Sequence, residues 1–437
     1  MSASNPPPAA APTLYTIGGP PSLPTSAASL RLPAEHFAAS AAFLLLGAIA
    51  LVIVAPDLAA GLYQSPRVIA ATHLFTLGWL TTTIFGAFYQ LLPVALGAPI
   101  RSTRLGHAAY CAYVPGVALF VSGVALVRPA LIHAALVLVS VGVLCVVVNI
   151  GLTLPRATRR DVTWRAIALA LSCLVLTLLL GATLAVNLTS GMLAGLRVHV
   201  TAVHLHIALI GWVLVTIVGI SHRLLPMFLL AHGADARWTG RSLAALITGL
   251  ALLVIGFAAG SRVILWLAVA SIELGIGCFI AQAYSFARAR KRPRLDAGLE
   301  HAGVGLLFLV LAALLGPAVL AFGRDHARLA VAYVMLGLVG GLSLYVVGQF
   351  YKIVPFLAWI VRFRAVVGRR PVPAVADLYS ARAARLDLIA FSLGIPAMAA
   401  GVLFGSTGVV RLGSALFLAA VLLFVSQLVR IVWSNPQ

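Results

Sequence analysis

Acidic residues are scarce in this sequence, which has 10 Asp and Glu in 437 residues against 30 Lys and Arg. All charged residues together make up 9% of the chain, whereas soluble globular proteins carry about a quarter. Hydrophobic residues make up 62%, and the mean hydropathy is +1.08. A water-soluble fold could not place so much apolar sequence in its core. The composition therefore excludes a soluble protein and predicts an integral membrane protein whose partner is the lipid bilayer.

Paired or motif-spaced cysteines are also lacking. The four cysteines lie singly in apolar segments, with no disulfide or zinc-motif spacing between them: Cys111, Cys145, Cys173 and Cys278. The sequence has no phosphate loop, dinucleotide fingerprint, CxxCH or HExxH. These absences remove the usual signatures of nucleotide binding, covalent c-type haem and zinc proteolysis.

Twelve apolar runs are long enough to cross a membrane, which takes about twenty residues in a helix. They lie near 36–55, 67–95, 106–127, 131–152, 165–187, 199–230, 240–258, 262–287, 300–321, 328–360, 385–404 and 411–433. The predicted fold class is an all-α polytopic membrane protein with one twelve-helix domain over 35–434. Residues 1–34 are rich in Pro, Ala and Ser and lack a long apolar run, which predicts a disordered cytoplasmic tail and no signal peptide.

The basic residues orient the chain. The odd-numbered loops hold 7 of the 30 Lys and Arg, and the other 23 lie in the tail, the even-numbered loops and the C-terminus. Because cytoplasmic loops are rich in Lys and Arg, this predicts a multi-pass protein of the inner (cytoplasmic) membrane with both termini in the cytoplasm. The net charge of +20 lies in these short linkers, so nucleic acid is not an expected partner.

The second, sixth and tenth helices share a spacing of two glycines and a proline. The first glycine precedes the proline by fifteen residues and the second precedes it by seven in each copy. These residues are Gly78, Gly86 and Pro93, then Gly211, Gly219 and Pro226, then Gly340, Gly348 and Pro355. The spacing predicts three pseudo-symmetric four-helix units, about 36–152, 165–287 and 300–433. Glycines at fixed positions let membrane helices approach closely.

Two of these helices also carry histidines, in the segments His73 to Pro93 and His204 to Pro226. With twelve helices in three units, this pattern resembles subunit I of the haem-copper oxidases, the superfamily of cytochrome c oxidase subunit I and the nitric oxide reductase large subunit. The resemblance implies a low-spin haem ligand on the second helix, at His73. It implies an active-site copper ligand on the sixth helix, at His204 or His206.

The sequence departs from that family at its other ligands. The tenth helix of the family carries two histidines and the seventh carries two adjacent copper ligands, whereas 328–360 and 240–258 contain no histidine. The resemblance is therefore to a divergent member of the family, one that lacks the conventional binuclear centre. Oxygen or nitric oxide reduction by the family's usual mechanism is therefore not expected, and the enzyme class stays open.

His73 and His206 occupy the same repeat position, so His73 could meet His204 or His206 where the second and sixth helices touch. Such a pair could hold one b-type haem for redox relay, metal or haem handling, or a response to nitric oxide. Neutral imidazole suits both iron and copper. The alternative is that these histidines only hydrogen-bond neighbouring helices. A redox partner or other membrane subunits are possible further partners.

Copper is a second possible cofactor. His199 and His206 are seven residues apart and share a helix face, so that His73, His199 and His206 could form a copper site. Met335 replaces histidine in the third copy and is a candidate haem ligand, although a methionine there also suits core packing.

Glu273, near the middle of the eighth helix, is a candidate for a proton or ion path, because an ionisable residue is costly inside the membrane. A cofactor-free transporter or structural protein on the same scaffold is therefore the rival hypothesis. The remaining histidines, among them His36 and His301, lie near predicted helix ends and are expected to be ordinary interfacial residues.

Overall fold

The computed structural model describes residues 27–231, 235–291, 293–323 and 326–433. Within these ranges the chain is helical, with no strand, and twelve helical stretches are long and apolar enough to cross a membrane, as predicted. We number these stretches as spans 1 to 12. They are Leu30–Ile53, Pro66–Leu96, Thr103–Ala125, Pro129–Arg156, Val162–Ser190, Ala194–Leu229, Arg237–Ala258, Arg262–Arg288, Ala297–Phe322, Ala327–Val366, Ala381–Phe404 and Thr407–Trp433.

Sixteen α-helices build the described spans and the turns between them. They are α1 (Ala27–Ile53), α2 (Ala55–Ala59), α3 (Pro66–His73), α4 (Thr82–Leu96), α5 (Thr103–Ala125), α6 (Pro129–Thr153), α7 (Val162–Ser190), α8 (Arg197–His206), α9 (Val215–Leu229), α10 (Arg237–Ala258), α11 (Arg262–Arg288), α12 (Ala297–Phe322), α13 (Ala327–Val334), α14 (Leu344–Phe363), α15 (Ala381–Phe404) and α16 (Thr407–Trp433). Helix α1 begins before residue 35, and residues 1–26 of the expected tail lie outside the described part of the chain.

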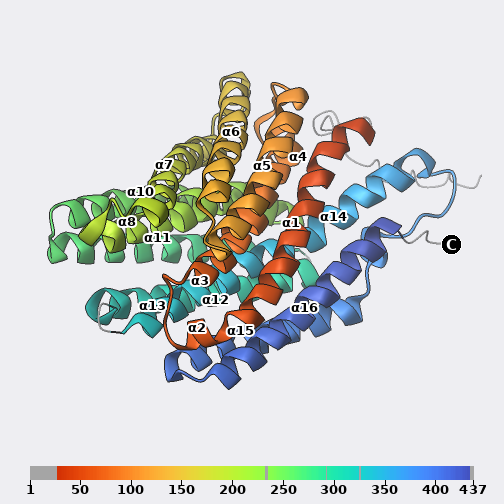
Figure 1. Cartoon of the computed structure of the whole chain (residues 1–437). Helices are drawn as coiled ribbons and strands as arrows, with labels where there is room; N and C mark the ends of the chain where they lie inside the picture. Colours follow the sequence, from red (N-terminus) through yellow and green to blue (C-terminus); the bar gives the residue numbers. More distant parts are fainter. Residues whose placement is uncertain (1–26, 232–234, 292, 324–325, 434–437) are drawn as a thin grey trace, which may run out of the picture.

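The helices run side by side as a bundle, which Figure 1 shows from one side. Spans 3 and 4, 7 and 8, and 11 and 12 form tight antiparallel pairs. Span 4 packs on span 5, span 8 on span 9, and span 12 on span 1, so that the chain closes into a ring. The threefold pseudo-symmetry itself stays a prediction.

Spans 2, 6 and 10, which we call the repeat spans, meet at the centre of this ring. Each contains one π-helical segment, and the three segments end at the same distance from their prolines: Leu74–Thr81, Ile207–Leu214 and Met335–Ser343. A π-helical turn inside an α-helix is rare and is frequently found at functional sites. The sequence contained no signal for these turns beyond the repeat.

The repeat glycines pack each repeat span against the first helix of its own unit. A Cβ atom at Gly86 would lie 2.7 Å from the Cβ of His36, and one at Gly219 would collide with Ala166. At Gly348 it would meet the carbonyl oxygen of Gly298 and lie 2.8 Å from the nitrogen of Ala302. The close approach expected from the glycine spacing is therefore present in all three copies.

Gly348→Ala is expected to lower the free energy of unfolding by about 1–3 kcal/mol, because the new methyl group meets backbone atoms that cannot rotate away. Reversible unfolding in mixed micelles would measure the change. Gly303→Ala on the partner helix is the matched control, since a Cβ there meets nothing within 4 Å. Equal stability of the two variants would contradict the close-packing role of Gly348.

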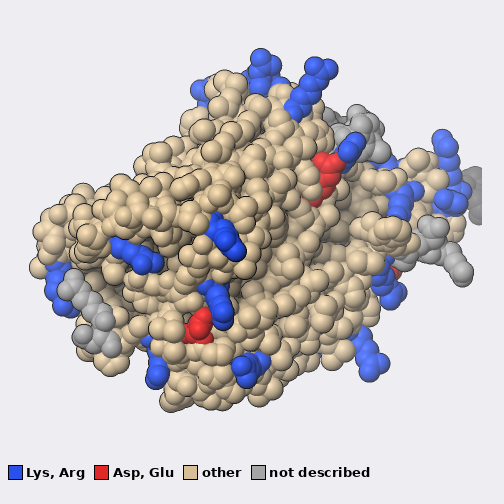
Figure 2. Space-filling view, in the orientation of Figure 1, with Lys and Arg blue, Asp and Glu red and all other residues tan. Residues whose placement is uncertain are grey.

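We call the end of the bundle that holds the start of α1 and the end of α16 the terminal face, and the other end the opposite face. Figure 2 shows a broad tan band with few charges. Blue side chains gather at the upper and right margins, where α4, α6, α14 and α16 end or begin, and others lie toward the left and lower margins. A belt of this kind suits the hydrocarbon core of a bilayer.

Candidate functional site

A cavity of about 1070 Å³ lies among the first ten spans, on the side of the π-helical segments toward the opposite face. Its lining includes all six site residues expected from the sequence: His73, His199, His204, His206, Glu273 and Met335. Ligand pockets usually measure roughly 300–1,000 Å³ and are mostly apolar with a few polar groups. The cavity has these features and is therefore the candidate functional site. We call it the main cavity.

His73 ends α3 and presents one free ring nitrogen. Its Nδ1 lies 2.8 Å from the carbonyl oxygen of Ile69. A carbonyl only accepts, so Nδ1 carries the hydrogen and Nε2 keeps its lone pair. Phe120 packs edge-on against the ring, with 5.0 Å between the ring centres. His73 is thus held in the tautomer that a metal ligand needs.

His204 and His206 differ in their partners although they are two residues apart. His206 donates from Nδ1 to the Ala202 carbonyl at 2.8 Å, and its Nε2 accepts from the hydroxyl of Tyr333 at 3.2 Å. His204 has a buried Nδ1 without a hydrogen-bond partner among the described residues. Its ring lies against Gly181, where a Cβ would be 3.0 Å from Cε1.

His73 therefore has His204, not His206, as its more available counterpart. His73 and His204 both line the main cavity. His206 is already engaged by Tyr333 of α13, whose ring stacks on it. The sequence had left the choice between His204 and His206 open, because it cannot show which of the two hydrogen-bonds a side chain from a third helix.

The three-histidine copper set is not assembled. His199 packs its ring on Phe257, with centres 5.1 Å apart, while His206 faces Tyr333. In the described ranges no group of three or more His, Cys, Asp or Glu side chains is placed to hold a metal ion. The seven-residue spacing puts His199 and His206 on one helix face, but each ring contacts a side chain of a different neighbouring helix.

Met335 and Glu273 line the same cavity from spans 10 and 8. Met335 is 4% exposed and opens the third π-helical segment, at the repeat position of the two histidines. Glu273 has a buried Oε1 with no hydrogen-bond partner in the described structure, and a Cβ at Gly316 would lie 3.5 Å from it. A carboxyl oxygen of this kind is free to bind a proton or a cation that enters the cavity.

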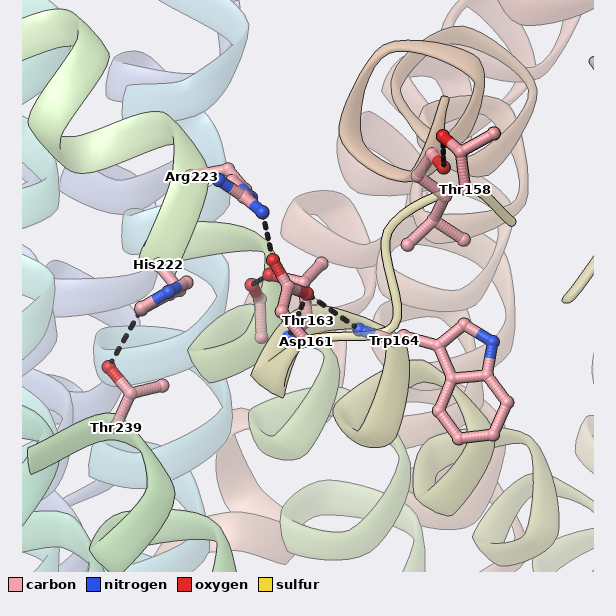
Figure 3. Close-up of polar contacts among 9 residues, drawn as sticks. Thr158, Asp161, Thr163, Trp164, His222, Arg223 and Thr239 are labelled. Carbon is pink, nitrogen blue, oxygen red and sulfur yellow. Dashed lines mark hydrogen bonds and ion pairs between the residues drawn. The ribbon is translucent and has the colours of Figure 1, made fainter. Parts of the chain in front are cut away.

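At the terminal face, ion pairs join neighbouring helices in two of the three units. Figure 3 shows Arg223 of α9 reaching Asp161, which caps α7 through the backbone of Thr163 and Trp164. Lys352 of α14 pairs in the same way with Asp296, the cap of α12, at 2.5 Å. In both units the cation stands three residues before the repeat proline. Its first-unit counterpart is Gln90, whose Oε1 is buried without a hydrogen-bond partner among the described residues.

His222, also in Figure 3, hydrogen-bonds Thr239 at 3.1 Å. It lies near the terminal face and does not line the main cavity. Its neighbour Arg223 faces away from it toward Asp161.

A buried polar network in spans 9 to 11 was missed by sequence reasoning. His301 is not an interfacial residue, because it is 0% exposed and its Nε2 lies 2.9 Å from Oδ1 of Asp387, itself 0% exposed. The hydroxyl of Tyr351 donates to the other oxygen of Asp387. An acidic residue inside the apolar run 385–404 was the available signal, since a carboxylate there needs a partner.

Comparison with protein-family models and with curated proteins finds no match for this chain. The fold and the cavity thus define a polytopic α-helical membrane protein with an internal histidine-lined site. The relationship to haem-copper oxidase subunit I stays a hypothesis that rests on the sequence pattern.

Proposed function

We propose that this chain is a haem-copper-oxidase-I-like membrane protein without the conventional binuclear centre, and that it binds one b-type haem in the main cavity. The observation that carries the proposal is that His73 and His204 line the same large apolar cavity. Nδ1 of His73 is held by a backbone carbonyl, and Nδ1 of His204 has no hydrogen-bond partner among the described residues. Histidine is a common axial ligand of haem iron.

The residues present fit such a group. The apolar lining suits a macrocycle, the orphaned Nδ1 of His204 needs a partner, and His73 is held with Nε2 free. His73 and His204 would hold the haem, with Met335 as a third candidate. When bound, the haem would supply one-electron redox chemistry. The surrounding apolar side chains would exclude water. The backbone carbonyl of Ile69 would fix the orientation of the His73 imidazole.

The role we propose is redox relay, metal or haem handling, or a response to nitric oxide, with another membrane subunit or a redox protein as partner. The protein would lie in the inner membrane with its terminal face in the cytoplasm. The reason is that 23 of the 30 Lys and Arg lie in the N-terminal tail, the even-numbered loops and the C-terminus, and cytoplasmic loops are rich in these residues. Copper bound by fewer than three histidines is an alternative occupant of the same cavity.

A cofactor-free transporter is the second candidate, and Glu273 favours it. Its buried Oε1 has no hydrogen-bond partner among the described residues and lies on the cavity wall. A protein of this kind would carry protons or a small solute past Glu273. The Glu273→Gln variant of such a transporter would lose proton or solute flux, and the protein would have no visible absorbance from a cofactor.

The deciding experiment is a reduced-minus-oxidised visible spectrum of the purified protein, with metal analysis of the same sample. We expect a stoichiometric b-type spectrum that His73→Ala or His204→Ala abolishes, since each change removes a ligand. His133→Ala is the matched control, because His133 bonds Thr189 outside the main cavity and should leave the spectrum intact. A colourless protein without iron or copper, from cells supplied with both, would overturn the haem proposal and favour the transporter.

A further inference from the structure

The main cavity extends along two sides of span 6. The ring of His204 lies beside Gly181 of α7, whereas the ring of His206 stacks on Tyr333 of α13. Residues two apart in an α-helix project about 200° apart, so the two rings point to opposite sides of the span. The lining accordingly includes residues of α3 and α7 as well as residues of α11, α12 and α13. We call the side with Tyr333 and Glu273 the acidic side.

Glu273 has no partner of opposite charge inside the protein. Among the described residues that line the main cavity it is the one that is acidic, and none of them hydrogen-bonds or ion-pairs with its carboxyl group. Arg262 stands eleven residues earlier in α11, which is roughly 16 Å along the helix and too far for an ion pair. Because an acidic side chain within the membrane nearly always has a partner, we expect that partner to be a ligand in the cavity.

The surroundings of Glu273 favour an organic cation over a metal ion. In the described part of the chain no group of three or more His, Cys, Asp or Glu side chains could hold a metal. The acidic side offers aromatic rings instead, from Phe257 and Tyr333, and aromatic faces attract cations. His206 donates from Nδ1 and accepts at Nε2, so its ring is neutral and does not repel a positive charge.

The cavity also reaches the opposite face of the bundle. Gly260, in the turn between α10 and α11, is part of its lining, and so is Arg262 at the start of α11. Arg262 is exposed, so that solvent and salt screen its charge. A solute can therefore enter from this face and pass along α11 to Glu273.

We propose that the acidic side of the main cavity binds a bulky organic cation, whose positive charge pairs with the carboxylate of Glu273 and whose apolar groups pack on the aromatic and aliphatic lining. The inference names the solute class of the second candidate function, the transporter, and rests on that function for its role in the cell. Binding does not need a haem, because His204 points to the other side of span 6.

Tetraphenylphosphonium is a suitable probe, since it is a large apolar cation. Equilibrium dialysis of the radiolabelled probe against the purified protein in a neutral detergent should show saturable binding. Glu273→Gln should weaken this binding by about tenfold or more, because it removes one partner of a charge pair in an apolar cavity. Glu300→Gln is the matched control, since Glu300 is an exposed glutamate of α12 that does not line the main cavity.

Tetraphenylborate separates the effect of charge from that of shape, because it has nearly the same size and the opposite charge. Glu273→Gln should leave its binding unchanged or strengthen it. Since binding is measured at equilibrium, the result is read independently of the haem spectrum and of solute flux. Three results would overturn the proposal: no saturable phosphonium binding, equal phosphonium affinity of Glu273→Gln and Glu300→Gln, or an equal loss of borate binding in Glu273→Gln.

Discussion

Asp387→Ala is expected to lower the free energy of unfolding by about 3–5 kcal/mol, the usual cost of removing one partner of a buried ion pair. Asp387 and His301 are both 0% exposed, and Tyr351 is 2% exposed. Nδ1 of His301 donates to the Ala297 carbonyl, so its Nε2 faces Asp387. The alanine would strand both His301 and the Tyr351 hydroxyl without an acceptor.

The same network supplies its own control. Replacing His301 and Asp387 together by leucine removes both polar partners, so the double variant should be more stable than Asp387→Ala alone. Reversible unfolding in mixed micelles would compare the two with the unchanged protein. If Asp387→Ala loses less than about 1 kcal/mol, the His301–Asp387 contact does not stabilise helices α12 and α15, and the inferred network is wrong.

The twelve spans could be predicted because each needs only local information, a run of about twenty apolar residues. The repeat glycines could be interpreted because their contacts recur with a fixed period, as Gly86, Gly219 and Gly348 do. By contrast, the start of α1 at Ala27 lay outside the apolar run that was used to find it. Helix ends depend on capping and on neighbouring helices, which a hydropathy pattern does not contain.

The sequence singled out residues that line one cavity, but it did not show how their side chains pair. His73, His204, His206, Glu273 and Met335 all line one cavity, as residues that are costly or special inside a membrane often do. Which of them are partners depends on side chains from other spans. Tyr333 hydrogen-bonds His206 and Phe257 packs on His199, so the copper set of three histidines is not formed.

The contact between the buried residues His301 and Asp387 could not be predicted from the sequence either. His301 is the fifth residue of α12, so its place near a helix end suggested an exposed position. Asp387 comes from a span that follows almost a hundred residues later, and only the packing of α12 on α15 joins them. A single sequence carries no record of that contact.

Trp212→Ala is expected to cost about 3–5 kcal/mol of unfolding free energy, because the indole is 1% exposed and its loss leaves a cavity at the centre of the bundle. The ring packs on Phe85 and Phe88 of span 2, and its Nε1 donates to Thr81. Trp433→Ala is the matched control, since that side chain is 81% exposed and should change stability little. Trp212→Phe keeps most of the apolar contact and should lose less than the alanine variant. A Trp212→Ala protein as stable as Trp433→Ala would mean that the contact between spans 2 and 6 is not packed as described.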